Sequence, residues 1–148
     1  VYGGEIGYGL YEVTAAPADN WAKVGDRFVL ADKLAADVFA AARVEGTRRV
    51  KDVLPVMIAR CAHPFRGLAG AEGFWDFDVP VFDADYVTDD AGTGFVHTAP
   101  GHGADDFHIG KRYGLEIYNP VDNAGRFVAE VEHFAGMNIF DANPKIVE

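Results

Sequence analysis

A glycine-rich stretch in the second half of the chain restricts the fold more than any other part of the sequence. Residues 92–114 read GTGFVHTAPGHGADDFHIGKRYG and contain six glycines. The pattern predicts a strand over residues 94–97 and a helix over residues 104–113, which Gly114 would end. Glycines in the loop between the strand and the helix permit backbone angles that other residues resist, so the chain can reverse sharply there. The stretch therefore predicts a strand, a tight loop and a helix in close succession.

The rest of the sequence predicts short strands around one further helix. The apolar residues within 32–43 recur with the spacing of one helix face, which predicts a helix there. Asp32 stands where a carboxylate would complement the N-terminus of that helix. Many short strands with two helices indicate an α+β domain, mostly β, with a barrel-like sheet and a few short helices. The predicted strands cover residues 6–13, 27–30, 49–58, 74–82 and 86–88, and residues 117–139 are predicted as short strands and turns.

Length and composition fit one ordinary globular domain. The chain has 148 residues, of which 49% are hydrophobic and 24% charged. No apolar run reaches the roughly 18 residues that would span a membrane, so we expect no membrane association. Cys61 is the only cysteine, which rules out an intramolecular disulfide and a cysteine-based zinc cage. We therefore expect a monomer in a reducing, cytoplasmic setting.

The charge is unevenly distributed. The formal net charge is −10, yet residues 43–66 carry six basic and two acidic side chains. The overall sign argues against a free-standing nucleic-acid binder, which is normally basic. The alternative for the basic stretch is a solvated face with alternating charge. If the chain contacts phosphate, the best candidates are Arg48, Arg49, Lys51, Arg60 and Arg66.

The polar side chains of the glycine-rich stretch leave several chemistries open. Its histidines and aspartates have the spacing H-x4-H-x2-D-D-x-H, which matches no zinc motif. A phosphate-binding loop would need G-x-x-x-x-G-K-[ST], which is absent, and paired aspartates would repel phosphate. Asp105 and Asp106 also fit the first turn of a helix, where acids are common for structural reasons alone. The remaining alternative is a pocket in which a carboxylate holds an ammonium group beside His97.

The same stretch carries a specific resemblance. GTGFVHTAPGHGADDF, followed by GKRYGLE, resembles the editing domain of bacterial isoleucyl-tRNA synthetases. DYVTDDA at residues 85–91 and HPFRG at residues 63–67 fit the same type, whereas the valyl and leucyl relatives share only G-T-G and a P-A-H-D core. The resemblance implies a barrel-like editing domain of the valyl, leucyl and isoleucyl type. It also implies that residues 1–148 are a single editing-domain fragment, truncated just after the T-T-T-P-W stretch that faces the family's pocket.

The resemblance implies a role for each matching residue of the site. Asp106 matches the aspartate that holds the α-ammonium group of the substrate. His97 matches the histidine that bounds the side-chain pocket and excludes isoleucine, so these two residues are the predicted catalytic pair. The predicted substrate-binding residues are Ala99, His102, Gly92, Thr93, Gly94, Phe95, Thr98, Gly101 and Gly103.

The resemblance also implies a reaction and its partners. The predicted reaction is hydrolysis of valine from the 3′ end of the tRNA for isoleucine, with valyl-adenylate as a second substrate. The expected partners are that tRNA and the rest of a parent synthetase. Editing is expected to need no metal or cofactor, whereas the parent enzyme uses ATP and Mg. We expect the isolated fragment to be weak, and two alternatives stay open: a non-catalytic tRNA-docking or structural module, and a metal-dependent hydrolase.

Overall fold

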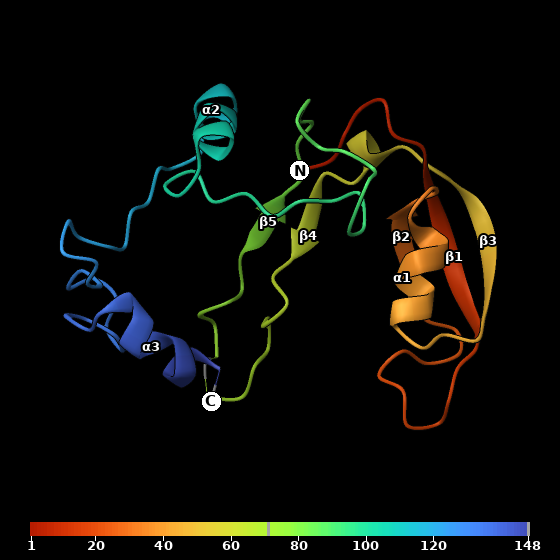
Figure 1. Ribbon diagram of the computed structural model, residues 1–148, viewed down its shortest axis with the longest axis horizontal. Helices are drawn as coiled ribbons and strands as arrows, with labels where there is room; N and C mark the ends of the chain where they lie inside the picture. The colour runs from red at the N-terminus through yellow and green to blue at the C-terminus, as the bar shows by residue number, and fades with distance from the viewer. Residues whose placement is uncertain (71, 148) are drawn as a thin grey trace. The chain divides into compact units, whose positions relative to one another are not determined.

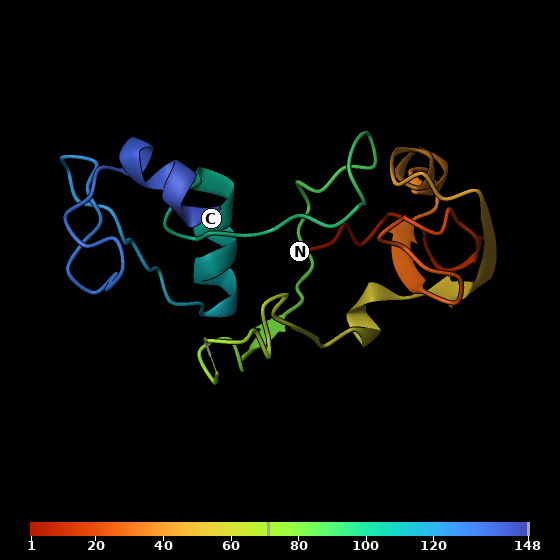
Figure 2. The same ribbon diagram turned by 90° about the horizontal axis from the view of Figure 1, so that it is seen from below.

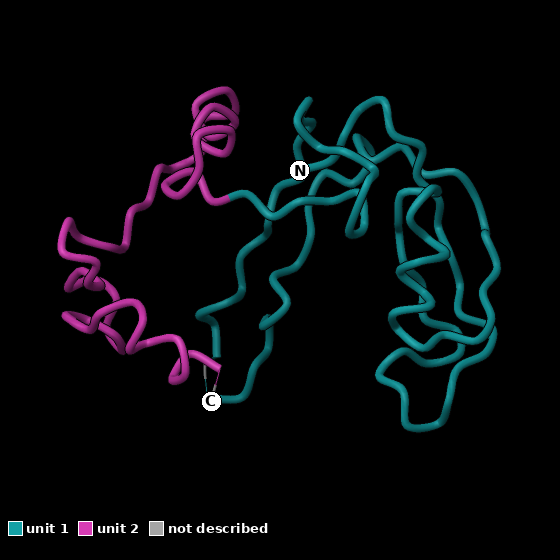
Figure 3. The backbone as a smooth tube through the Cα atoms, in the orientation of Figure 1, with its two compact units in different colours: residues 1–98 teal, residues 99–148 magenta. Residues whose placement is uncertain are grey.

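A computed structural model describes residues 1–70 and 72–147. It divides the chain into two compact units, residues 1–98 and residues 99–148, which Figure 3 colours separately. The described residues contain five strands, three α-helices and one short 3-10 helix, which confirms the mixed α and β fold class. Both sheets in these ranges are open, and the barrel-like closure expected from the sequence is not seen there. That the chain is a single domain stays a prediction.

The first unit is built on a three-stranded antiparallel sheet. Its central strand is β1 (Tyr8–Ala15), which pairs with β2 (Arg27–Ala31) on one side and β3 (Gly46–Val53) on the other. Figure 1 shows β3 at one edge of this sheet. The strand predicted over residues 49–58 begins earlier, at Gly46, which pairs with Ala15 of β1. It also ends earlier, at Val53, because Pro55 starts a 3-10 helix, η1 (Pro55–Met57).

The core of this unit lies between the sheet and helix α1 (Ala35–Ala41). Side chains alternate between the two faces of a strand, so Tyr11 and Val13 of β1 lie on the same face. They form a buried cluster with Leu30 of β2 and with Ala35 and Phe39 of the helix. The apolar spacing that predicts this helix is therefore confirmed as the face that packs on the sheet.

The predicted role of Asp32 at the start of this helix is wrong. The helix begins at Ala35, and its N-cap residue, Leu34, makes no side-chain capping bond. The Asp32 carboxylate instead accepts hydrogen bonds from the Tyr11 hydroxyl at 2.7 Å and from Arg49 at 2.8 Å. Hydrogen bonds from two donors on neighbouring strands stabilise a carboxylate more than the weak dipole of a short helix does.

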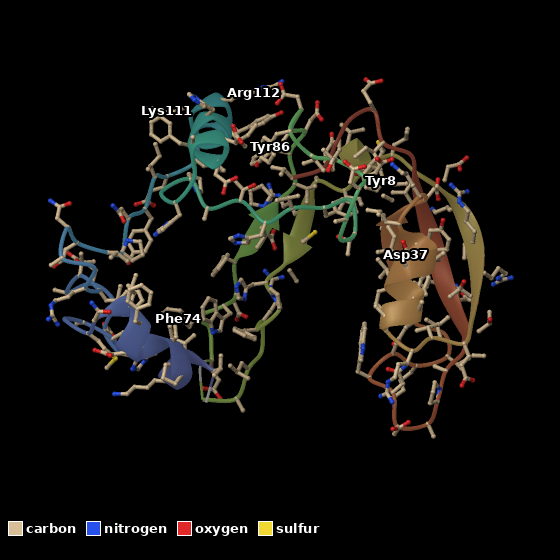
Figure 4. All side chains as sticks on the ribbon, in the orientation of Figure 1. Tyr8, Asp37, Phe74, Tyr86, Lys111 and Arg112 are labelled. Carbon is tan, nitrogen blue, oxygen red and sulfur yellow. The ribbon has the colours of Figure 1, made fainter. Side chains whose placement is uncertain are left out.

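A separate hairpin follows η1. It pairs β4 (Arg60–Ala62) with β5 (Asp78–Pro80), a much shorter strand than the one predicted over residues 74–82. A two-stranded hairpin needs further contacts to be stable. Aromatic rings supply them here: His63 stacks on Trp75 with ring centroids 4.3 Å apart, and Phe74, labelled in Figure 4, packs edge-on against Trp75.

The glycine-rich segment of this unit docks onto the sheet without forming a strand. The strands predicted over residues 86–88 and 94–97 are wrong: the first is turn and loop, and in the second only Phe95 makes an isolated bridge. The Thr93 carbonyl accepts a hydrogen bond from the Ala31 amide at 2.9 Å. The buried Tyr8 hydroxyl, labelled in Figure 4, donates to the Gly94 carbonyl at 2.5 Å.

The second unit holds the other two α-helices. Helix α2 (Ala104–Tyr113) has the predicted bounds, and Gly114 ends it with a left-handed φ of 67°. Helix α3 (Ile139–Ile146) is not predicted from the sequence; the Asn138 side chain accepts a hydrogen bond from the Phe140 amide at its start. No helix in the described ranges combines the length and the apolar character that crossing a membrane requires.

The docking of the glycine-rich segment predicts different costs for two alanine substitutions. Gly92 and Gly94 both have positive φ, but a Cβ on Gly94 would lie 2.5 Å from the Ala31 Cβ, whereas one on Gly92 would meet open space. We expect Gly94→Ala to lower the free energy of unfolding by about 2–5 kcal/mol and Gly92→Ala by about 1–2 kcal/mol. Urea unfolding of both variants measures this, and equal losses would contradict the packing role of Gly94.

The ion pair of Asp32 predicts a pH dependence of stability. The hydrogen bonds from Arg49 hold the pKa of Asp32 below its usual value. Stability from this group is therefore complete above the unfolded pKa of about 3.9 and is lost as the pH falls through the lower folded value. Unfolding measured from pH 7 to pH 3 should show the largest loss for Asp32→Asn at pH 7 and a shrinking difference below about pH 4.

A double-mutant cycle controls this experiment. Both side chains of the Asp32–Arg49 pair are 38% exposed, so solvent screening keeps the total effect modest. In an Arg49→Gln background, the pH-dependent part of the Asp32→Asn effect should largely disappear. If it persists unchanged, Arg49 is not what lowers the pKa of Asp32.

Candidate functional site

The two acids at the start of α2 have different surroundings. Asp106 lies in the first helical turn, and its carboxylate accepts a hydrogen bond from the Ala99 amide at 2.9 Å. Asp106 is half-buried, whereas Asp105 is exposed. Neighbouring helix residues point about 100° apart, so only one of the pair can face the loop. The carboxylate of Asp106 closes the loop over residues 99–103.

Two glycines of the motif are required by close packing in this unit. A Cβ on Gly101 would overlap the Tyr118 carbonyl oxygen. A Cβ on Gly110, which is buried in α2, would lie 2.7 Å from the Pro100 Cβ. Only glycine lets the loop, the helix and the segment after the helix approach so closely. The glycines therefore fix the position of the loop that Asp106 holds.

A cavity of about 250 Å³ lies against this loop. Ala99 and His102, both predicted as pocket residues, line it. The rest of the lining is not predicted from the sequence, although Pro100 and Glu116 lie within the stretches that carry the resemblance. These further lining residues are Pro100, Glu116, Tyr118 and Pro120.

The predicted residues of the first unit have mainly structural contacts. Gly94 and Thr93 bond to the sheet as described above, and the Phe95 ring lies 4.8 Å from that of Tyr8. The Thr98 hydroxyl is within 3.4 Å of the Tyr86 hydroxyl. His97 is exposed. His97 and Asp106 belong to different units, so their shared catalytic role stays a prediction.

The five basic residues proposed to contact phosphate lie in two places. Arg48, Arg49 and Lys51 are on β3, whereas Arg60 and Arg66 are at the β4–β5 hairpin. Within the described part of the chain, every one of them except Lys51 is in an ion pair with a carboxylate. The pairs are Arg48 with Glu12, Arg49 with Asp32 and Asp52, and Arg60 and Arg66 with Asp78.

These ion pairs reduce the positive potential of the basic stretch. The hydrogen bonds from Arg66 and Arg60 lower the pKa of Asp78, and those from Arg27 and Arg48 lower the pKa of Glu12. Each of these carboxylates is shared by two arginines, so its single negative charge offsets one of their two positive charges. The phosphate-contact role of the five basic residues stays a prediction.

The structure offers no obvious ligand set for the metal alternative. Among residues 1–70 and 72–147, no three His, Cys, Asp or Glu side chains gather as a metal site would require. His102, Asp106 and His108 are thus not assembled around a common point in that part of the chain. In the second unit, Ala99 connects the Asp106 carboxylate, which accepts its amide, with the cavity, which it lines.

Comparison with known proteins identifies close relatives. The family described as "Leucyl-tRNA synthetase, editing domain" matches residues 57–142. The chain is 44% identical over 165 residues to the isoleucine–tRNA ligase of Rhodopseudomonas palustris and 43% identical over 162 residues to that of Ruegeria pomeroyi. These alignments cover 99% and 100% of the chain but 16% of each relative. The isoleucine–tRNA ligase of Halorhodospira halophila is 54% identical over 93 residues, 62% of this chain and 10% of that protein.

The contact between Asp106 and Ala99 predicts a difference in stability between the two acids. Asp106→Ala leaves the Ala99 amide without its acceptor, which should lower the free energy of unfolding by about 1–3 kcal/mol. Asp105→Ala removes only a favourable charge at the helix start, worth about 0.3–1 kcal/mol. Denaturant unfolding of the two variants checks this order, and a greater loss for Asp105→Ala would show that Asp106 does not hold the loop.

Proposed function

Because the chain belongs to the isoleucyl-tRNA synthetase family, as a piece of its editing domain, we propose that it hydrolyses valine from mischarged tRNA for isoleucine. The observation that carries this proposal is the hydrogen bond from the Ala99 amide to the Asp106 carboxylate at the start of α2, since Ala99, together with His102, also lines the cavity of this unit. The chain spans about 16% of the length of its relatives, so the reaction, the substrate and the partners are all part of the proposal.

A synthetase for isoleucine needs an editing site in addition to its synthetic site, because valine and isoleucine differ by only one methylene group. A binding pocket gains only about 1–3 kcal/mol from such a difference, and isoleucyl-tRNA synthetase is the standard example of this limit. A pocket that admits valine and excludes isoleucine by size solves the problem without further binding energy. In this proposal the sieve includes the cavity that Ala99 and His102 line.

In the proposed mechanism, Asp106 binds the α-ammonium group of the esterified valine. A hydrogen bond between carboxylate and ammonium is charge-assisted and directional, so it fixes the direction of the amino-acid side chain. Asp106 lies in the first turn of α2, where the positive end of the helix dipole stabilises its negative charge. Water then attacks the ester carbonyl directly, and the tRNA hydroxyl leaves with the proton that water provides.

His97 and His102 are proposed to bound the side chain of the substrate. His97 would form the wall that isoleucine meets, and His102 already lines the cavity of the second unit. We propose no metal or cofactor for the editing step, while the synthetic reaction of the parent enzyme would use ATP and Mg. The proposed partners are the 3′ end of the tRNA and the rest of the synthetase.

The test separates the charge of Asp106 from its structural hydrogen bond. Asp106→Asn keeps an oxygen that can accept from the Ala99 amide but removes the charge that would bind the ammonium group. In the parent synthetase, we expect this variant to deacylate valyl-tRNA about 10–100-fold more slowly, the value of one charge-assisted hydrogen bond. Asp105→Asn is the matched control and should deacylate at a near-normal rate.

His97→Ala should have a different effect from either aspartate variant. Removing the proposed wall should allow correctly charged isoleucyl-tRNA to be hydrolysed, measured as loss of labelled isoleucine from the tRNA. Normal deacylation by Asp106→Asn would overturn the role of Asp106. Complete protection of isoleucyl-tRNA in the His97→Ala enzyme would overturn the role of His97.

A further inference from the structure

The outer edge of β3 is open. The strand order is β2-β1-β3, so β3 pairs with β1 alone among the described strands, and Figures 1 and 2 show it at the margin of the sheet. Its six inner residues are exposed. Within residues 1–70 and 72–147, none of its backbone groups bonds to a segment on the side away from β1. An open edge of this kind is a template for another extended chain.

A groove runs beside this edge. A cavity of about 400 Å³ lies between α1 and the start of β3. The helix presents two small exposed residues to it, Ala36 and Ala40, and the strand contributes Gly46 and Thr47. Every second side chain of a segment added to an edge strand points to the same face of the sheet. Alternate side chains of such a segment would therefore enter the groove, where small apolar groups fit best.

The opposite face of the same edge is basic. Tyr11 and Val13 of β1 face α1, so Leu10 and Glu12 lie on the other face. Arg48 stands opposite Glu12 and Lys51 opposite Leu10, which places both on the face away from the helix. The remaining side chains of an added segment would lie on the face of these two cations, of which Arg48 is also paired with Glu12 at 2.8 Å and Lys51 has no ion pair among the described residues. Acidic residues at those positions would form favourable cross-strand pairs.

A second copy of this chain is a poor occupant for this edge. Antiparallel pairing of two β3 strands would bring Arg48, Arg49 and Lys51 of each copy against like charges. The register with β1 also shifts between Arg49 and Lys51, which leaves Val50 as a bulge. Bulges and basic side chains are devices that keep edges from pairing with themselves. The regular part of the edge is therefore residues 46–49.

RNA is disfavoured by the acids that border the groove. Asp32 and Glu45 both line it, and their carboxylates would repel phosphate. Arg49 is held by Asp32 at 2.8 Å and by Asp52 at 2.8 Å, and Arg48 is held by Glu12 at 2.8 Å. A backbone edge, in contrast, offers alternating N–H and C=O groups that match another polypeptide.

We propose that the groove between α1 and the outer edge of β3 binds an extended acidic peptide segment by strand addition. The segment would be about four or five residues long and would alternate small apolar side chains with Asp or Glu. The apolar residues would lie over Ala36 and Ala40, and the acids would lie near Arg48 and Lys51. This site is independent of the proposed deacylation.

The first measurement compares two labelled peptides on the 148-residue chain. The probes are fluorescein-labelled Glu-Val-Glu-Val-Glu and Lys-Val-Lys-Val-Lys, both blocked at the ends, with binding followed by fluorescence anisotropy. We expect the acidic peptide to bind about tenfold more tightly or better, and to shift the amide NMR signals of residues 46–49. Equal binding of the two peptides, or shifts confined to other residues, would overturn the proposal.

Variants of exposed residues give the second measurement. Ala40→Trp fills the groove and should weaken the acidic peptide about tenfold, whereas Ala41→Trp, exposed on the same helix but outside the groove lining, should not. Lys51→Glu should also weaken the acidic peptide. Identical effects of the two tryptophan variants would overturn the site, and so would displacement of the peptide by a short single-stranded RNA.

Discussion

The hydroxyl of Tyr8 ties together the segments on which the first unit depends. Tyr8 lies in the central strand and is only 2% exposed. Its oxygen accepts a hydrogen bond from the Gly3 amide and donates one to the Gly94 carbonyl. Burial raises the pKa of this hydroxyl, so it stays protonated and able to donate. Without this bond, two backbone groups from distant parts of the chain would be left unsatisfied in a buried position, which is unfavourable.

The glycines of the motif serve two different physical purposes. Gly92 and Gly114 have a left-handed backbone with open space where a side chain would stand, so glycine there relieves backbone strain alone. Gly101 and Gly110 have neighbours so close that any side chain would collide with them. Only the second kind determines how the loop of Asp106 packs. The close-packed glycines of the motif therefore have a packing role, and they position the loop that the Asp106 carboxylate closes.

Local signals in the sequence were sufficient for some elements and insufficient for others. The bounds predicted for helix α2 are those of the structure, and Gly114 ends it as expected. Asp32 was misassigned, because its partner Arg49 lies on another strand and no local pattern shows such a pairing. The segment around Phe95 has the composition of a strand, but in the described structure it makes an isolated bridge to Tyr2 and hydrogen bonds to Val1 instead of joining a sheet. Helix α3 was missed because Pro144 lies inside it and weakens the helical pattern.

The same limit applies to the candidate site. The motif pointed to Asp106 and to the loop before it, and the hydrogen bond to Ala99 explains why that acid, and not Asp105, faces the loop. The lining residue Glu116 ends the GKRYGLE stretch and Tyr118 lies just beyond it, and only the fold shows that both border the cavity. Long-range packing of this kind leaves no periodic trace in a sequence.

The distribution of charge suggests how the proposed site would treat its substrate. Residues 67–148 carry four basic and fifteen acidic side chains, a field that attracts an ammonium group and repels phosphate. Within the described residues, most arginines of the basic stretch form ion pairs with nearby carboxylates, which offset much of their positive charge. Attraction for the tRNA backbone would therefore have to come from the rest of the parent synthetase. On this view the chain contributes selectivity for a small amino acid, through one carboxylate and one cavity, while affinity for the nucleic acid is supplied elsewhere.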